Sequence, residues 1–123
     1  MPVFREGSAT LFEMHGSQFH AYANPTRGSQ ELSAWRLNVP PNQAGAAHRV
    51  SKEEVFLVLS GMMTVTIDGE PVDVSAGDVV LVHAGSELRI DSGLTGCRAW
   101  VTTSSGIEVV TVDGARIIPP WTN

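Results

Sequence analysis

The chain has 123 residues, of which 42% are hydrophobic and 17% charged, and its formal net charge is −5. This length and composition indicate one globular domain over residues 1–123 and exclude a disordered chain. The few basic residues form no run, so we expect no nucleic-acid partner.

Neither the thiol content nor the hydropathy of the chain indicates a secreted or membrane protein. Cys97 is the single cysteine, so no disulfide framework is expected, and a lone cysteine packs more often as a small hydrophobe than it acts as a nucleophile. The first residues lack the apolar stretch of a signal peptide. No apolar run reaches the roughly 18 residues that span a membrane. We therefore expect a cytoplasmic protein without membrane contact.

Gly, Pro, Asn and Asp interrupt the chain at short intervals, and the segments between them are β-rich. This pattern is typical of an all-β sandwich or barrel, and no segment keeps the 3.6-residue apolar period of a long helix. We expect about nine to eleven strands, with residues 8–13 a short turn or edge strand. In chain order the main strands are expected at 18–23, 31–39, 48–50, 55–59, 62–67, 71–74, 79–83, 87–91, 98–103 and 107–112.

Some of these segments also predict which side chains are buried. The strand over 31–39 places Trp35, Leu37 and Val39 on one face. The runs at 55–59 and 79–83 are apolar at successive positions, which predicts strands buried on both faces.

Two shorter segments predict how the chain turns and ends. Asp68-Gly69 between two strands is the strongest hairpin signal in the sequence. The apolar tail at 117–121 must lie either on this barrel or on a partner subunit.

The segment from Pro40 to Gly61 carries the most chemistry. It contains Gly45, His48 and Glu54 before Gly61, and Gly77 and Gly85 follow at the separation of a second motif. In order and spacing, residues 31–101 resemble the cupin superfamily, and the chain is most similar to small single-domain bacterial cupins. The resemblance implies an all-β, cupin-type jelly-roll barrel with a pocket at its mouth.

The chain departs from the cupin metal-ligand pattern at two positions. The pattern implies histidines where this chain has Val50 and Leu88, so His48 and Glu54 are the two usual ligand positions that remain. Catalytic zinc sites generally have three protein ligands, and non-haem iron sites use two histidines and a carboxylate. The cofactor is therefore left open, with a divalent metal possible if another histidine supplies a third ligand.

Three hypotheses for the function follow. The first is an enzyme in which Glu54 transfers a proton and His48 orients or charges it, in an isomerase- or cyclase-like reaction on a small organic metabolite. The second is a metal-dependent cupin with a non-standard divalent site. The third is a non-catalytic ligand-binding or sensing module whose metal site has decayed. A buried, self-satisfied pair without a function is also consistent with these residues.

Other histidines are weaker site candidates. His83 follows a strand that ends near the barrel mouth, so it is a weak candidate for the third metal ligand, and a local hydrogen bond is the alternative. His15 and His20 are more often structural in such positions. Glu53 is expected to face solvent or a turn, because its side chain points away from that of Glu54.

Apolar side chains supply the candidate pocket walls. Val50 and Leu88 would make the pocket drier, and burial alone would raise the pKa of Glu54 whereas a charged histidine would lower it. Other candidates for the walls are Trp35, Phe56, Met62, Trp100 and Tyr22, each of which could equally be core packing.

Two arginines and the sheet edges indicate partners. Arg36 and Arg98 lie on predicted strands, where each could bind a ligand carboxylate bidentately or form a surface salt bridge. The apolar tail and the open edges of a small barrel favour a homodimer.

Overall fold

The structure is a computed structural model that describes residues 2–123. Within this range the chain forms one ten-stranded sheet and short 3-10 helices, with no α-helix, so the predicted all-β class is confirmed. No helix in these residues is long and apolar enough to cross a membrane. The strands are β1 (Thr10–Met14), β2 (Ser17–Ala23), β3 (Leu32–Val39), β4 (His48–Val50), β5 (Glu54–Ile67), β6 (Glu70–Ser75), β7 (Val79–Val82), β8 (Glu87–Ser104), β9 (Val109–Thr111) and β10 (Arg116–Ile117), and the 3-10 helices are η1 (Glu6–Ser8), η2 (Pro25–Arg27) and η3 (Pro120–Thr122).

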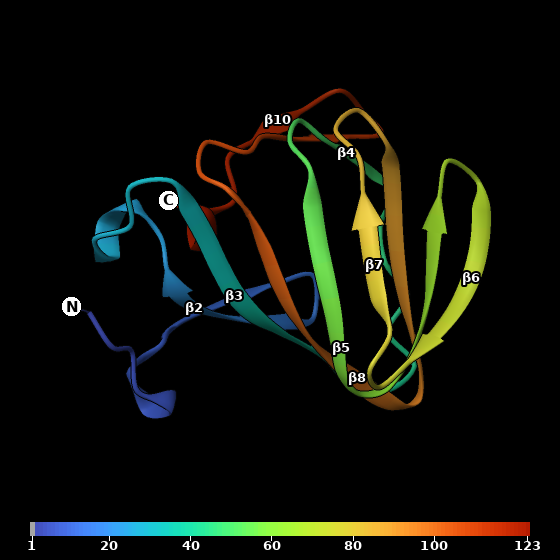
Figure 1. The fold of residues 1–123 in the computed structure, drawn as a ribbon. Helices are drawn as coiled ribbons and strands as arrows, with labels where there is room; N and C mark the ends of the chain where they lie inside the picture. Colours follow the sequence, from blue (N-terminus) through green and yellow to red (C-terminus); the bar gives the residue numbers. More distant parts are fainter. Residues whose placement is uncertain (1) are drawn as a thin grey trace.

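Two long strands, β5 and β8, connect the two parts of the rolled sheet, one with β2 and β3 and the other with β6 and β7. β5 and β8 pair antiparallel from Glu54↔Thr103 to Ile67↔Leu88. β8 also pairs with β3 through its second half and with β4 at its start. In Figure 1 these two strands run side by side through the middle of the molecule, with β2 and β3 to one side and β6 and β7 to the other. The sequence predicted each long strand as two short ones, because glycines interrupt the apolar patterns at 61 and 93–96.

Two glycines allow β5 and β8 to continue through that interruption. Gly61 has φ +76° and Gly96 has φ +69°, and the ladder shifts register on either side of Gly61. A Cβ on Gly61 would lie 2.1 Å from the carbonyl oxygen of Gly96, which no side chain tolerates. The glycine that ends the first cupin-like motif is therefore required by backbone proximity as well as by positive φ.

The prediction that β5 and β7 are buried on both faces is wrong. Burial alternates along β5, with Phe56 and Val58 inside and Leu57 39% exposed. Its partner on β7, Val79, is 63% exposed. A continuous apolar run does not identify which face meets the core, and here the outer face of β5 and β7 lies uncovered on this chain.

The predicted hairpin and the face of β3 are confirmed. Asp68 and Gly69 both have positive φ and connect paired Ile67 and Glu70, as a two-residue turn requires. Trp35, together with Leu37 and Val39, points into the core cluster.

The C-terminal tail lies on the chain's own barrel, which was one of the two predicted alternatives. The ring of Trp121 stacks on Phe19 with centroids 3.6 Å apart and is 8% exposed. Asn24 fixes the same tail by donating from its side-chain amide to the carbonyl oxygen of Trp121. The tail thus closes one end of the barrel interior.

Candidate functional site

The barrel interior contains a cavity of about 510 Å³. Its walls are mostly aromatic and aliphatic, as is typical of sites for small organic molecules. They come from inward-facing positions on β2, β3, β5 and β8, from the loop between β8 and β9, and from the C-terminal tail. The principal apolar lining residues are Phe19, Trp35, Leu37, Phe56, Leu88, Ile90, Ile107 and Trp121.

Glu54 is the buried carboxyl group of this cavity. It begins β5 in the same inward phase as Phe56, and it is 6% exposed. It forms no hydrogen bond or ion pair with any residue of 2–123, so no nearby charge offsets the cost of burying it. Burial raises its pKa from an ordinary 4.5 to about 7. The group is therefore balanced between its neutral and charged forms near neutral pH.

His48 lines the same cavity from β4, half-buried near the rim. Its Nδ1 lies 2.9 Å from the carbonyl oxygen of Ala46. Because a carbonyl oxygen can only accept, Nδ1 carries the hydrogen in this contact. In the neutral ring Nε2 then remains a free acceptor. His48 is oriented by the backbone beside it and forms no hydrogen bond with Glu54.

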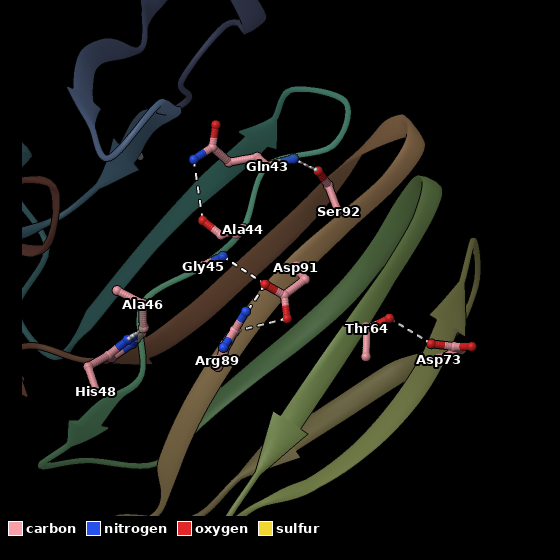
Figure 2. A network of polar contacts seen from close by, with 10 residues as sticks. All are labelled: Gln43, Ala44, Gly45, Ala46, His48, Thr64, Asp73, Arg89, Asp91 and Ser92. Carbon is pink, nitrogen blue, oxygen red and sulfur yellow. Dashed lines mark hydrogen bonds and ion pairs between the residues drawn. The ribbon is translucent and has the colours of Figure 1, made fainter. Parts of the chain in front are cut away.

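The segment between β3 and β4 positions His48 by lying against β8 (Figure 2). The backbone N–H of Gly45 donates to Asp91 Oδ1 at 2.8 Å, and Arg89 holds the same carboxylate at 3.1 Å. The backbone N–H of Gln43 donates to Ser92 Oγ at 2.9 Å. A Cβ on Gly45 would lie 2.1 Å from the carbonyl oxygen of Ile90, so this glycine permits the close approach. The first motif therefore encodes both the imidazole and the backbone contact that aims it.

Several sequence-predicted residues lie together in the cavity, and others lie elsewhere. Phe56, Trp35 and Leu88 line it with His48 and Glu54. Val50 is buried in the core at 1% exposure but does not line the cavity. Trp100 points to the outer face of the sheet, where its ring lies 5.5 Å from that of Tyr22.

His83 also lies away from the cavity. Its Nδ1 is 3.0 Å from Glu53 Oε2 on the outside of the barrel, and its side chain is 73% exposed. This is the local contact that the sequence offered as the alternative to metal binding. Met62 is likewise outside the cavity and 52% exposed.

Two polar groups lie near the mouth: His15, for which the sequence favoured a structural role, and Asp113, which was missed as a site residue. His15 lines the exposed rim in a turn with φ +51°. Asp113 lies there too, and a hydrogen bond from the Thr111 hydroxyl lowers the pKa of its carboxyl group, so it is charged at neutral pH. Phe19 and Leu37 share the inward phase of the other core residues on their strands, so they could have been assigned to the wall. Trp121 gave no such signal.

The donor set does not fit the metal that the cupin resemblance implies. Within residues 2–123, no group of three or more His, Cys, Asp or Glu side chains is placed to hold an ion. Leu88, the cross-strand neighbour of His48, is 1% exposed and presents only carbon atoms at one of the expected ligand positions. Cys97 supplies no soft ligand or nucleophile here, because burial raises the pKa of its thiol to about 11.

Comparison with known proteins identifies the fold. Residues 35–92 match the family model described as the cupin domain. The polyketide cyclase RemF from Streptomyces resistomycificus superposes with a TM-score of 0.80 at 18% identity, covering 91% of this chain and 85% of RemF. An RmlC-like cupin from Shewanella frigidimarina has a TM-score of 0.71 at 20% identity, covering 81% of this chain and 86% of that one. Residues 35–92 therefore match the cupin domain, and the barrel of this chain has the cupin fold.

Two further proteins are similar to this chain, one in fold and one over part of its sequence. KdgF from Halomonas sp. superposes with a TM-score of 0.74 at 16% identity, over 85% of this chain and 93% of KdgF. Endoribonuclease YbeY from Myxococcus xanthus is 32% identical over 76 residues, which are 61% of this chain and 26% of that protein. The chain thus spans about a quarter of the length of this curated relative.

Proposed function

We propose that this cupin binds an apolar organic molecule with an enolisable carbonyl group and that Glu54 exchanges a proton with it. The observation that carries the proposal is a carboxyl group without a polar partner in an otherwise apolar cavity. With a pKa of about 7, such a group can both donate and accept a proton near neutral pH.

The cavity residues divide the chemistry between two groups. In its charged form Glu54 accepts the proton of an acidic C–H, and in its neutral form it returns that proton to another carbon or to the carbonyl oxygen. His48 presents Nε2 as a second acceptor, because its Nδ1–H is used by Ala46. The aromatic walls from Trp35 and Trp121 hold the flat, apolar part of the ligand. The result is enolisation, which underlies both isomerisation and aldol-type cyclisation.

The structural similarities support a reaction of this type without identifying its substrate. RemF is described as a polyketide cyclase, and it matches nearly the whole of this chain. Polyketide cyclisation involves acidic C–H groups between carbonyls and flat, apolar products. Such molecules agree in chemistry with the cavity of this chain.

Proton exchange into a model ketone tests the proposal directly. We suggest 2-tetralone in deuterated buffer, with loss of its C1 protons followed by NMR. The wild type is expected to accelerate exchange, with a rate that rises through about pH 7 as Glu54 becomes charged. The Glu54→Gln variant should lose about a hundredfold or more of this rate. A wild-type rate equal to that of Glu54→Gln would overturn the catalytic proposal.

Glu53→Gln is the matched control. Glu53 is the adjacent carboxylate, its side chain is 59% exposed, and it contacts His83 outside the barrel. This variant removes the same charge one residue away and should exchange 2-tetralone as fast as the wild type.

A non-catalytic binding module is the second candidate function. It is favoured by the absence, within residues 2–123, of any hydrogen bond that would position Glu54. Calorimetric titration with 2-tetralone separates the two candidates. Tight binding without accelerated exchange supports the binding module, whereas binding with Glu54-dependent exchange supports the enzyme.

A further inference from the structure

The outer face of β2, β3 and β8 carries a set of polar side chains that the barrel cavity does not use. They alternate with core residues, so they point away from the interior. The strand registers align them in two rows across the sheet. One row is Gln18, Asn38, Arg98 and Ser60, and the row beside it is His20, Arg36 and Trp100.

The two arginines of this face have no anionic partner within residues 2–123. By contrast Arg49, Arg89 and Arg116 each lie within 4 Å of a carboxylate. Neither Arg36 nor Arg98 forms a hydrogen bond or an ion pair to a side chain. The protein has 13 acidic residues against 8 basic ones, so the missing partner does not reflect a shortage of carboxylates.

On the β1 side of the sheet, acidic side chains are also distant from these arginines. The register places Glu13 of β1 opposite Gln18, at the far end of the first row. Three strand spacings separate Glu13 from Arg98, which is on the order of 14 Å. Leu11 is the β1 neighbour of His20, so no carboxylate enters the second row from that side.

Two polar atoms of this face are buried without a partner. Arg36 Nε is an unused donor, and Asn38 Oδ1 is an unused acceptor. The Asn38 amide nitrogen contacts His20 Nε2 at 3.3 Å, which leaves the oxygen free. A buried polar atom without a partner is energetically unfavourable, so both atoms favour a ligand that supplies the complementary groups.

The first row also lines a depression in the surface. Gln18, Asn38, Ser60 and Arg98 surround a cavity of about 340 Å³ together with Gly16, Val39, Pro40, Thr95 and Cys97. A depression with a guanidinium in its wall holds a small anion better than a flat face does, because the anion is partly shielded from water.

The local field is positive enough to act on a neighbour. The pKa of His20 lies below its usual value, first because the ring is partly buried and then because Arg36 and Arg98 repel its proton. His20 therefore reports the charge on this face.

We propose that this face, formed by Arg36, Asn38 and Arg98, binds a small oxyanion that also carries a hydroxyl group. The guanidinium groups take the anionic oxygens, which is the geometry that arginine favours. Asn38 Oδ1 accepts from the hydroxyl hydrogen. Monohydrogen phosphate and hydroxycarboxylates both have this chemistry. The site lies on the opposite face of the sheet from Glu54, so its occupant is distinct from the ligand of the barrel.

NMR titration of the histidine ring protons tests the proposal. Inorganic phosphate and malate are added separately to the full chain at constant ionic strength, with chloride as the reference salt. Either anion should shift the His20 resonances saturably and raise the His20 pKa, because it offsets the two arginines. His83, on another face, should respond equally to all salts.

Variants assign the effect to the arginines. Arg98→Gln should weaken phosphate or malate binding by at least about tenfold and by itself raise the His20 pKa. Arg116→Gln removes an exposed arginine that pairs with Glu108 and should bind like the wild type. Arg36→Gln is a second test, interpreted only if its histidine spectrum shows a native fold.

Three outcomes would overturn the proposal. The first is a His20 response to phosphate and malate no larger than the response to chloride. The second is an unchanged response in Arg98→Gln. The third is a change of oligomeric state in Arg98→Gln without any effect of either anion, which would assign the arginines to a contact between copies of the chain.

Discussion

The proton affinity of Glu54 makes a quantitative prediction about stability. Burial raises the pKa of this carboxyl group from 4.5 to about 7, and the group is 6% exposed, so solvent screens it little. The folded state therefore holds the proton over a pH range in which the unfolded state has released it. Stability falls as pH rises from about 4.5 to about 7, and the loss is complete above the folded-state pKa.

The size of the effect follows from the same two values. Their difference of about 2.5 corresponds to a loss of about 3 kcal/mol in the free energy of unfolding. Glu54→Gln removes the titration while keeping a side chain of the same shape. The variant should match the wild type at about pH 4 and exceed it by about 3 kcal/mol at about pH 9.

Urea denaturation of both proteins across this range measures the difference. The other titrating groups, including Asp113, are common to both proteins and cancel in the comparison. A stability difference that stays constant with pH would refute the reasoning. If the variant's stability advantage over the wild type grew as the pH fell, the reasoning would also be refuted, because that sign requires a lowered pKa for Glu54.

Three further predictions concern the ligand set, the strand interruption and the outer face. Leu88→His places a third donor beside the cavity imidazole and carboxyl, so it should bind zinc stoichiometrically by elemental analysis; no gain over the wild type would contradict the assigned geometry. Gly61→Ala should lower the free energy of urea unfolding by more than about 2 kcal/mol, because it adds a backbone clash to the positive-φ penalty. Gly77→Ala shares the positive φ but has open space around it, so it should cost only about 1 kcal/mol, and equal losses would refute the clash. We propose that a second copy of the chain covers the exposed aliphatic face of β5 and β7, where Leu57 and Leu81 are 39% and 50% exposed; Leu57→Asp should then convert a dimer to a monomer in light scattering, and a monomeric wild type would reject the dimer.

Much of the fold could be predicted because its signals are local. Asp68-Gly69 specifies a turn by its own backbone preferences, and the alternation around Trp35 specifies an inward face. The error at Leu57 has a physical origin. An unbroken apolar run shows that a strand is apolar, but only the packing of the whole barrel decides which of its faces is covered.

The sequence predicted which two polar residues share the cavity, but not their hydrogen-bond partners or the residues of the cavity wall. Motif spacing brought His48 and Glu54 to one cavity, yet the partner of His48 is the backbone of Ala46, which no side-chain pattern records. Val50 and Trp100 were assigned to the wall, but one lies in the core and the other on the outer face. Each depends on the local phase of its strand in the rolled sheet.

The leucine at position 88, where the cupin pattern has a histidine, and the raised pKa of Glu54 have one physical cause. A cation beside a carboxylate lowers its pKa, whereas an apolar surrounding raises it. With a histidine at position 88 and a bound ion, Glu54 would stay charged and act as a ligand. With leucine there, burial alone determines the proton affinity, and the same carboxyl group changes protonation near pH 7. We therefore compare the zinc-loaded Leu88→His variant with the double variant that also carries Glu54→Gln. The pH-dependent difference in stability between them should disappear with zinc bound and return when the zinc is chelated. If the difference persists with zinc bound, the neighbouring cation does not lower the pKa of Glu54, and this explanation is wrong.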